Sequence, residues 1–187
     1  MSVRDESKLP AAEDLIRWLV SYIGNDETKL NAGETLQYGF WLLRFEQGKS
    51  MLNLWERSAD GSDWIEGADF TLHCWTTQHA ACEIARAPFA PPRSDHLAAV
   101  SDGVMEGERV EAARDIESEG QSGWCLWTHR WNHDPFSLAF QHLFHVVEAR
   151  PDLIPYLALP PGYAFRQTDG PTIVGPDLSA ETPDSPE

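Results

Sequence analysis

Basic residues are scarce in this sequence. Its 187 residues include 14 lysines and arginines against 30 aspartates and glutamates, which gives a formal net charge of −16 at pH 7. Proteins bind nucleic acids and anionic membranes through lysine and arginine, so we expect neither as a partner. The acidity allows a basic protein as a partner instead, because long-range attraction speeds its encounter with an acidic surface. Solubility alone is the other interpretation of the same acidity.

Long hydrophobic runs and paired cysteines are also missing. No apolar stretch approaches the roughly 20 residues that a membrane-spanning helix needs. The charged segment 1–8 has neither the apolar stretch nor the small-residue cleavage site of a signal peptide. The three cysteines, Cys74, Cys82 and Cys125, form no CxxC motif and no disulfide pattern, so we expect free, mostly buried thiols. These features predict a cytoplasmic protein.

The sequence lacks the local signatures of common catalytic sites. It contains no G-x-S-x-G, GxxxxGK[ST], GxGxxG or HExxH. His129 and His133 are four residues apart and His142 and His145 are three apart, spacings at which two histidines on a helix can share a metal. No third ligand is clearly spaced, so we expect no catalytic residue, no metal and no cofactor. A metal-dependent enzyme that uses the segment His129–His145 is kept as an alternative.

The hydrophobic pattern predicts an α+β fold, with a mainly antiparallel sheet and a few packed helices. Apolar residues at helical spacing predict a helix over residues 11–23. A shorter period on both sides of the turn at residues 47–49 predicts a hairpin formed by residues 36–46 and 51–57. The alternation in residues 69–77 (DFTLHCWTT) predicts a third strand.

The second half has a similar mixture of elements. We expect strands over residues 97–101, 122–128 and 163–167, and an edge strand over residues 109–112. An aspartate followed by proline is typical of a helix start and predicts a helix over residues 134–149. The buried stripe of this helix would consist of Phe136, Phe140, Leu143, Phe144 and Val147.

Composition divides the chain into three segments. The proline-rich stretch 88–94 breaks regular structure and is the best candidate for a domain boundary. We therefore expect an N-terminal α+β region at residues 1–90 and a second domain at residues 91–176. Residues 177–187 contain four acids, no base and two prolines, which predicts an acidic disordered tail.

Acidic side chains concentrate in residues 101–120, where seven acids stand against two arginines. The segment lies between two predicted strands, so its acids would line a defined edge. A docking surface for a basic partner and a solvated hairpin both agree with this pattern. The following loop adds the tryptophan and arginine side chains that interfaces favour. The candidate partner-binding residues are Asp102, Glu106, Glu108, Glu117, Glu119, Trp127, Arg130 and Trp131.

Several short motifs occur together in the C-terminal half. They are A-V-S-D-G-V at residues 99–104 with E-G at 106–107, Q-S-G-W at 121–124, R-P-D-L-I-P-Y-L at 150–157 and L-P-P-G-Y-A-F at 159–165. In this order they resemble a family of small bacterial immunity-protein domains found beside polymorphic and contact-delivered toxins. The resemblance covers about residues 97–168. The residue types themselves, such as Trp124 in an alternating strand, indicate that the motifs hold the fold.

The resemblance implies an immunity protein that neutralises a cognate toxin by occlusion, without catalysis. The missing signal peptide favours a toxin that acts in the cytoplasm, for example a nuclease or a nucleotide-directed toxin, and the acidic surface fits a basic nuclease best. The family pattern has acids where this chain has Gln121 and the segment 128–131; if those acids contact the toxin in relatives, the toxin of this chain is a different one. An adaptor or regulatory module without a toxin partner is the alternative from another functional class.

Overall fold

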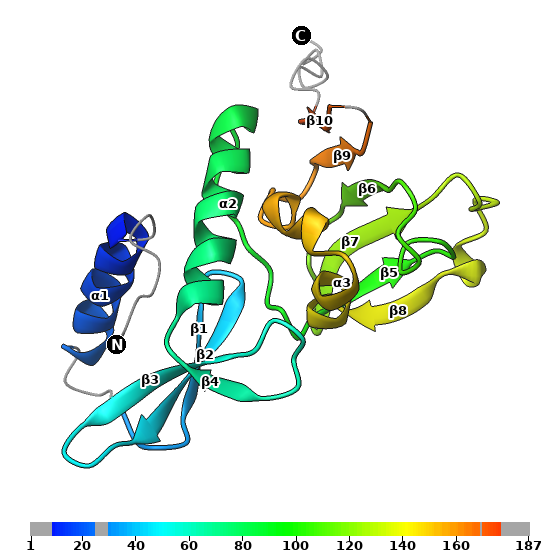
Figure 1. Ribbon diagram of the computed structural model, residues 1–187. Coiled ribbons are helices and arrows are strands. Elements are labelled where there is room, and N and C mark those ends of the chain that lie inside the picture. Colours follow the sequence, from blue (N-terminus) through cyan, green and yellow to red (C-terminus); the bar gives the residue numbers. More distant parts are fainter. Residues whose placement is uncertain (1–8, 25–29, 169, 177–187) are drawn as a thin grey trace, which may run out of the picture.

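The computed structural model describes residues 9–24, 30–168 and 170–176, and the predicted tail at 177–187 lies outside them. The fold is α+β, as predicted, with two β-sheets and helices packed on them (Figure 1). Helix α2 (Asp69–Ala85) stands between helix α1 (Leu9–Ile23) and the short 3-10 helix η3 (Pro151–Tyr156), and it contacts both. The predicted first helix is therefore confirmed.

The first sheet is antiparallel and has the strand order β1-β2-β3-β4. Its strands are β1 (Thr35–Tyr38), β2 (Trp41–Gln47), β3 (Leu52–Arg57) and β4 (Trp64–Glu66). Strands β2 and β3 pair around the turn at residues 47–49, which confirms the predicted hairpin. A tight turn at Gly39, whose φ is +58°, divides the first predicted strand into β1 and β2.

The second sheet has six strands in the order β10-β9-β6-β7-β5-β8. They are β5 (Leu97–Val100), β6 (Glu111–Arg114), β7 (Gln121–Trp127), β8 (Ala139–His142), β9 (Ala164–Arg166) and β10 (Thr172–Val174). All neighbouring strands are antiparallel except β5 and β7, which are parallel. The expectation of an edge strand near residues 109–112 is wrong, because β6 pairs with β7 on one side and β9 on the other.

The strand predicted at residues 69–77 is also wrong, since these residues form the first half of α2. A long-range contact explains the difference. The buried carboxylate of Glu56, on β3, accepts hydrogen bonds from the backbone N–H groups of Phe70 and Thr71 at 3.0 and 2.7 Å. It thereby satisfies two of the N–H groups that a helix N-terminus leaves without internal partners. Local alternation carries no information about this cap.

The helix predicted over residues 134–149 is shorter than expected. Asp134 caps the 3-10 turn η2 (Pro135–Ser137) through a 2.9 Å bond from Phe136 N to its carboxylate, and the chain then forms β8 before helix α3 (Leu143–Ala149). Phe136 and Phe140, predicted to be buried, are 96% and 60% exposed. Pairing with β5 at the sheet edge holds the segment extended, so two aromatic side chains stay in solvent.

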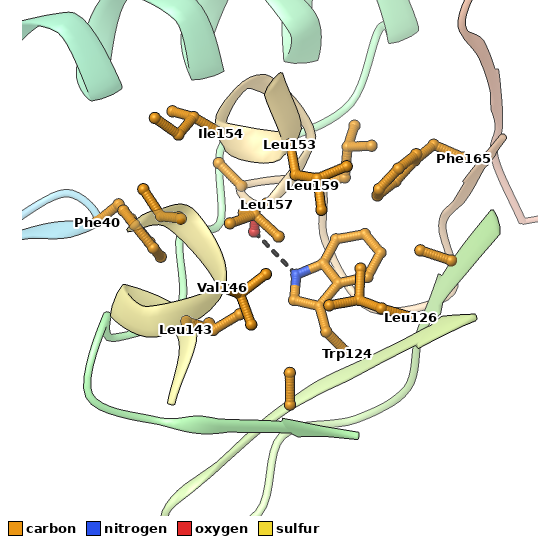
Figure 2. Packing of buried hydrophobic residues seen from close by; sticks show 14 of the residues in the cluster. Phe40, Trp124, Leu126, Leu143, Val146, Leu153, Ile154, Leu157, Leu159 and Phe165 are labelled. Carbon is orange, nitrogen blue, oxygen red and sulfur yellow. Dashed lines mark hydrogen bonds between the residues drawn. The ribbon is translucent and has the colours of Figure 1, made fainter. Parts of the chain in front are cut away.

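The larger hydrophobic core lies between the second sheet, α3, η3 and α2. Trp124 is at its centre, where the indole N–H donates to the Leu157 carbonyl at 3.0 Å and the ring meets Phe165 edge-on (Figure 2). Phe40, from the N-terminal half, joins the same cluster. A smaller core packs α1 and the first sheet around Leu15 and Leu72. The division near residue 90 stays a prediction.

Candidate functional site

One end of the six-stranded sheet gathers most of the candidate residues. Because β5 and β7 are parallel, the loops that follow them leave the sheet at the same end (Figure 1). We call residues 101–110 the acidic loop and residues 128–138 the aromatic loop. Six of the eight predicted site residues lie on these loops or directly beside them: Asp102, Glu106, Glu108, Trp127, Arg130 and Trp131.

Glu117 and Glu119 lie at the opposite end of the sheet, in the connection between β6 and β7. The seven-residue strand β7 separates the two ends by roughly 20 Å at the usual rise per residue. Glu117 also pairs with Arg114, a buried residue whose guanidinium donates to the carbonyls of Ser122 and Leu159. The carboxylate of Glu117 therefore balances a charge inside the fold.

Hydrogen bonds join the two loops. The buried hydroxyl of Thr128 donates to the Asp102 carbonyl at 2.8 Å and accepts from the Arg130 N–H at 3.2 Å. The Thr128 N–H donates to the Ser101 hydroxyl at 3.0 Å. The start of the aromatic loop is thus held against the acidic loop through side chains that the protein interior covers.

The tip of the aromatic loop is equally well held. The Trp131 indole N–H donates to the Asp134 carbonyl at 3.0 Å, and its ring centroid lies 5.7 Å from that of Trp127. Asn132 accepts a hydrogen bond from the Asp134 N–H at 3.0 Å. The 3-10 turn that follows presents Phe136 almost entirely to solvent. Hydrogen bonds therefore hold the backbone of the loop, and the Trp131 ring is held between Asp134 and Trp127.

Ion pairs connect the acidic loop to the aromatic loop and to the core. Glu108 pairs with Arg130, and its second oxygen lies 3.5 Å from His129 Nδ1. The buried guanidinium of Arg150 donates to the carbonyls of Val104 and Glu108, each at 2.8 Å. Arg150 belongs to the R-P-D motif, so this motif residue holds the backbone of the acidic loop in place.

Asp152 forms an ion pair with Arg150 and has a lowered pKa. Burial alone would raise the pKa of Asp152, but hydrogen bonds from Arg150 and Gln167 and the Arg150 charge outweigh it and hold the pKa below its usual value. Arg150 bonds both Asp152 oxygens, at 3.0 and 2.8 Å, and Gln167 bonds one of them at 2.6 Å. The charged carboxylate of Asp152 therefore holds Arg150 in the position from which it bonds the acidic loop.

The histidines of the enzyme alternative are divided between the two ends of the sheet. His129 and His133 lie in the aromatic loop, whereas His142 ends β8 opposite Leu97 and His145 lies on α3. Among the described residues, no three His, Cys, Asp or Glu side chains come together as metal ligands. The hollow between the two loops, lined by Asp102 and Trp131, measures only about 140 Å³. This volume is below the roughly 300–1,000 Å³ that is typical of small-molecule sites.

Phe136 is the surface residue that sequence reasoning missed. Asp134 and Pro135 predict the start of one helix over residues 134–149, whereas Asp134 caps only a 3-10 turn and strand β8 follows it. A usable signal was present, since residues 135–147 contain no Asp, Glu, Lys or Arg in a chain that is 24% charged. Only the pairing of β8 with β5 decides which of these uncharged residues face solvent.

Comparison with known families identifies the C-terminal part of the chain. The model of the Imm33-like domain matches residues 77–173. The chain belongs to the Imm33-like family. The match contains both loops of the site and begins inside α2, after the first sheet, and it overlaps the resemblance at residues 97–168. No curated protein and no solved structure matches the chain. No helix among the described residues is long and apolar enough to cross a membrane.

Proposed function

We propose that this Imm33-like protein is an immunity protein that binds a bacterial toxin in the cytoplasm and neutralises it by occlusion. The family name supports an immunity function, and the site supports binding rather than chemistry. Its prominent groups are aromatic rings and paired charges around a small hollow, the kind of surface that buries a partner side chain.

The observation that carries the proposal is the exposed ring of Phe136 on the same internally hydrogen-bonded loop as Trp131. A phenylalanine that is 96% exposed contributes nothing to the core, and its loop is held by bonds to Asp134 and Asn132. Burying such a ring stabilises a complex by about 1.5–3 kcal/mol. Because the loop is already ordered, little conformational entropy is lost when a partner covers it.

The charge of the chain indicates which kind of toxin it would bind. Asp102 and Glu106 are exposed on the acidic loop, while Glu108 is already paired with Arg130. With a net charge of −16, the chain attracts a basic protein and repels an acidic one. A toxin with a positive surface, such as a nuclease, fits this balance.

The test begins with capture of the partner from the native host. Tagged protein is used as bait, bound proteins are identified by mass spectrometry, and the gene of the captured protein is then expressed alone and with the immunity protein. We expect growth arrest when the toxin is expressed alone and rescue in the presence of the wild-type chain. Phe136→Ala should weaken binding by about tenfold or more, in line with the loss of a central aromatic contact.

Ile116→Ala is the matched control for this experiment. Ile116 is 79% exposed, like Phe136, but lies in the connection between β6 and β7 at the other end of the sheet. The control should bind and protect like the wild type. If both variants lose toxin binding equally, or if neither loses it, the docking surface lies elsewhere. A captured partner that is not toxic on its own would favour the adaptor alternative.

A further inference from the structure

Strand β8 is one of the two outer strands of the six-stranded sheet. It pairs with β5 through residues 139–142, and no other described strand pairs with its free side (Figure 1). An outer strand presents N–H and C=O groups that can pair with another chain, and proteins usually guard it with proline or charge. Pro171 and Pro176 bracket the opposite outer strand, β10. Strand β8 contains neither proline nor a charged residue.

The pairing register determines which backbone groups of β8 point away from the sheet. The Leu143 N–H donates to the His96 carbonyl at 2.9 Å, in line with the register of β8 on β5. Hydrogen-bonded and non-bonded pairs alternate in an antiparallel ladder, so Gln141 directs its backbone groups toward β5. Phe140 and His142 therefore direct their N–H groups outward, together with the Phe140 carbonyl.

The exposed edge carries an aromatic side chain and continues an apolar row, as protein interfaces often do. Phe140 is 60% exposed, and Phe136 lies four residues before it, continuous with the proposed docking surface. Across the sheet, Phe140 is aligned with Ala99 of β5, and Ala99 with Cys125 of β7. These residues are only partly buried and form an apolar row on the face opposite Trp124. A strand added beside β8 would extend that row by one position.

Charge distinguishes between two possible occupants of the edge. A second copy of this chain would bring another −16, and the two copies would repel each other. The exposed acids Asp102 and Glu106 lie at the same end of the sheet as the start of β8, because Ala139 pairs with Val100. The edge is uncharged and its surroundings are acidic, so it fits an extended segment of a basic protein.

We propose that an extended segment of the toxin pairs with β8 and adds a seventh strand to the sheet. The inference rests on the proposed function and specifies how the toxin is held. Main-chain hydrogen bonds to Phe140 and His142 would supply affinity, while the side chains of Phe136 and Phe140 would select apolar residues on the incoming strand.

Phe140→Pro tests the main-chain part of the proposal. Proline removes the outward N–H and leaves the hydrogen bonds of Gln141 to β5 in place, a position at which edge strands tolerate proline. Phe140→Val is the matched control, because it keeps the N–H and suits a strand. With an inactive form of the captured toxin as the probe, we expect Phe140→Pro to raise Kd by tenfold or more. Phe140→Val should stay within about threefold of the wild type.

Hydrogen exchange of the wild-type chain provides a test that needs no substitution. The amides of Phe140 and His142 should exchange quickly in the free protein and at least tenfold more slowly in the toxin complex, whereas the Gln141 amide should be protected in both. A complex that neutralises the toxin while these two amides keep their free rates would overturn the β8 assignment and leave the proposed function standing. Concentration-dependent protection without toxin would show that the edge pairs with a second copy, which also overturns the inference.

Discussion

Reversing the exposed acids at one end of the sheet should change the encounter with a basic partner. In the variant Asp102→Lys with Glu106→Lys, each substitution changes the local charge by two units. A unit charge about 10 Å away in water contributes roughly 0.4 kcal/mol per unit, so the variant loses about 1.7 kcal/mol of attraction for each unit charge that faces it. Association should slow by about tenfold at 10 mM salt, because 1.4 kcal/mol corresponds to a factor of ten.

Salt dependence makes this prediction specific. At 0.1 M salt the Debye length is about 10 Å, so the penalty should fall to about 0.6 kcal/mol, or roughly threefold in rate. Stopped-flow mixing of the toxin with the variant and with the wild type across a salt series gives the association rates at 10 mM and at 0.1 M salt. Dissociation should change less than association, since neither acid forms an ion pair with another of the described residues.

The opposite end of the sheet provides the control and a contrasting result. Glu119→Lys, about 20 Å away along β7, should bind at the wild-type rate in moderate salt. Glu117→Lys should lower the free energy of unfolding by about 1–2 kcal/mol, because Arg114 is buried and loses its carboxylate while keeping its carbonyl acceptors. The reasoning is refuted if reversal at Asp102 and Glu106 leaves the association rate at 10 mM salt unchanged.

Three further predictions concern what holds the site in place. Trp124→Ala should destabilise the fold by about 3–5 kcal/mol in urea unfolding, because it empties the centre of the larger core; an unchanged midpoint would mean that Trp124 is not a core residue. Glu56→Gln should cost about 1–3 kcal/mol, because α2 loses a charged acceptor for two N–H groups, and far-UV circular dichroism should report the loss of helix; retained stability would contradict the cap. The pKa of Asp152 is lowered in the folded protein, so its ionised carboxylate stabilises the fold above the unfolded pKa of about 3.9, and this contribution is lost as pH falls through the folded pKa. Asp152→Asn should therefore make the loss of stability with falling pH less steep. If the stability of the variant depends on pH as the wild type does, Asp152 does not stabilise the fold through its charge.

The sequence predicted the elements whose pattern is local. Helix α1 follows from apolar spacing, the β2–β3 hairpin from its turn, and β7 from strict alternation around Trp124. Composition and net charge were sufficient to favour a protein partner over nucleic acid or a membrane. The motifs of the C-terminal half were sufficient to indicate the family, because a set of short motifs in a fixed order is far more specific than any one of them.

Tertiary contacts decided the rest. The carboxylate of Glu56 caps the start of α2, and β5 pairs with residues 139–142 and holds them as a strand. Both determinants come from residues far away in the chain, which no local period can report. The same holds for the acids of residues 101–120, which look like one surface in sequence. The hairpin between β6 and β7 separates them by the length of β7, because an antiparallel connection places its turn at one end of the sheet and its open strand ends at the other.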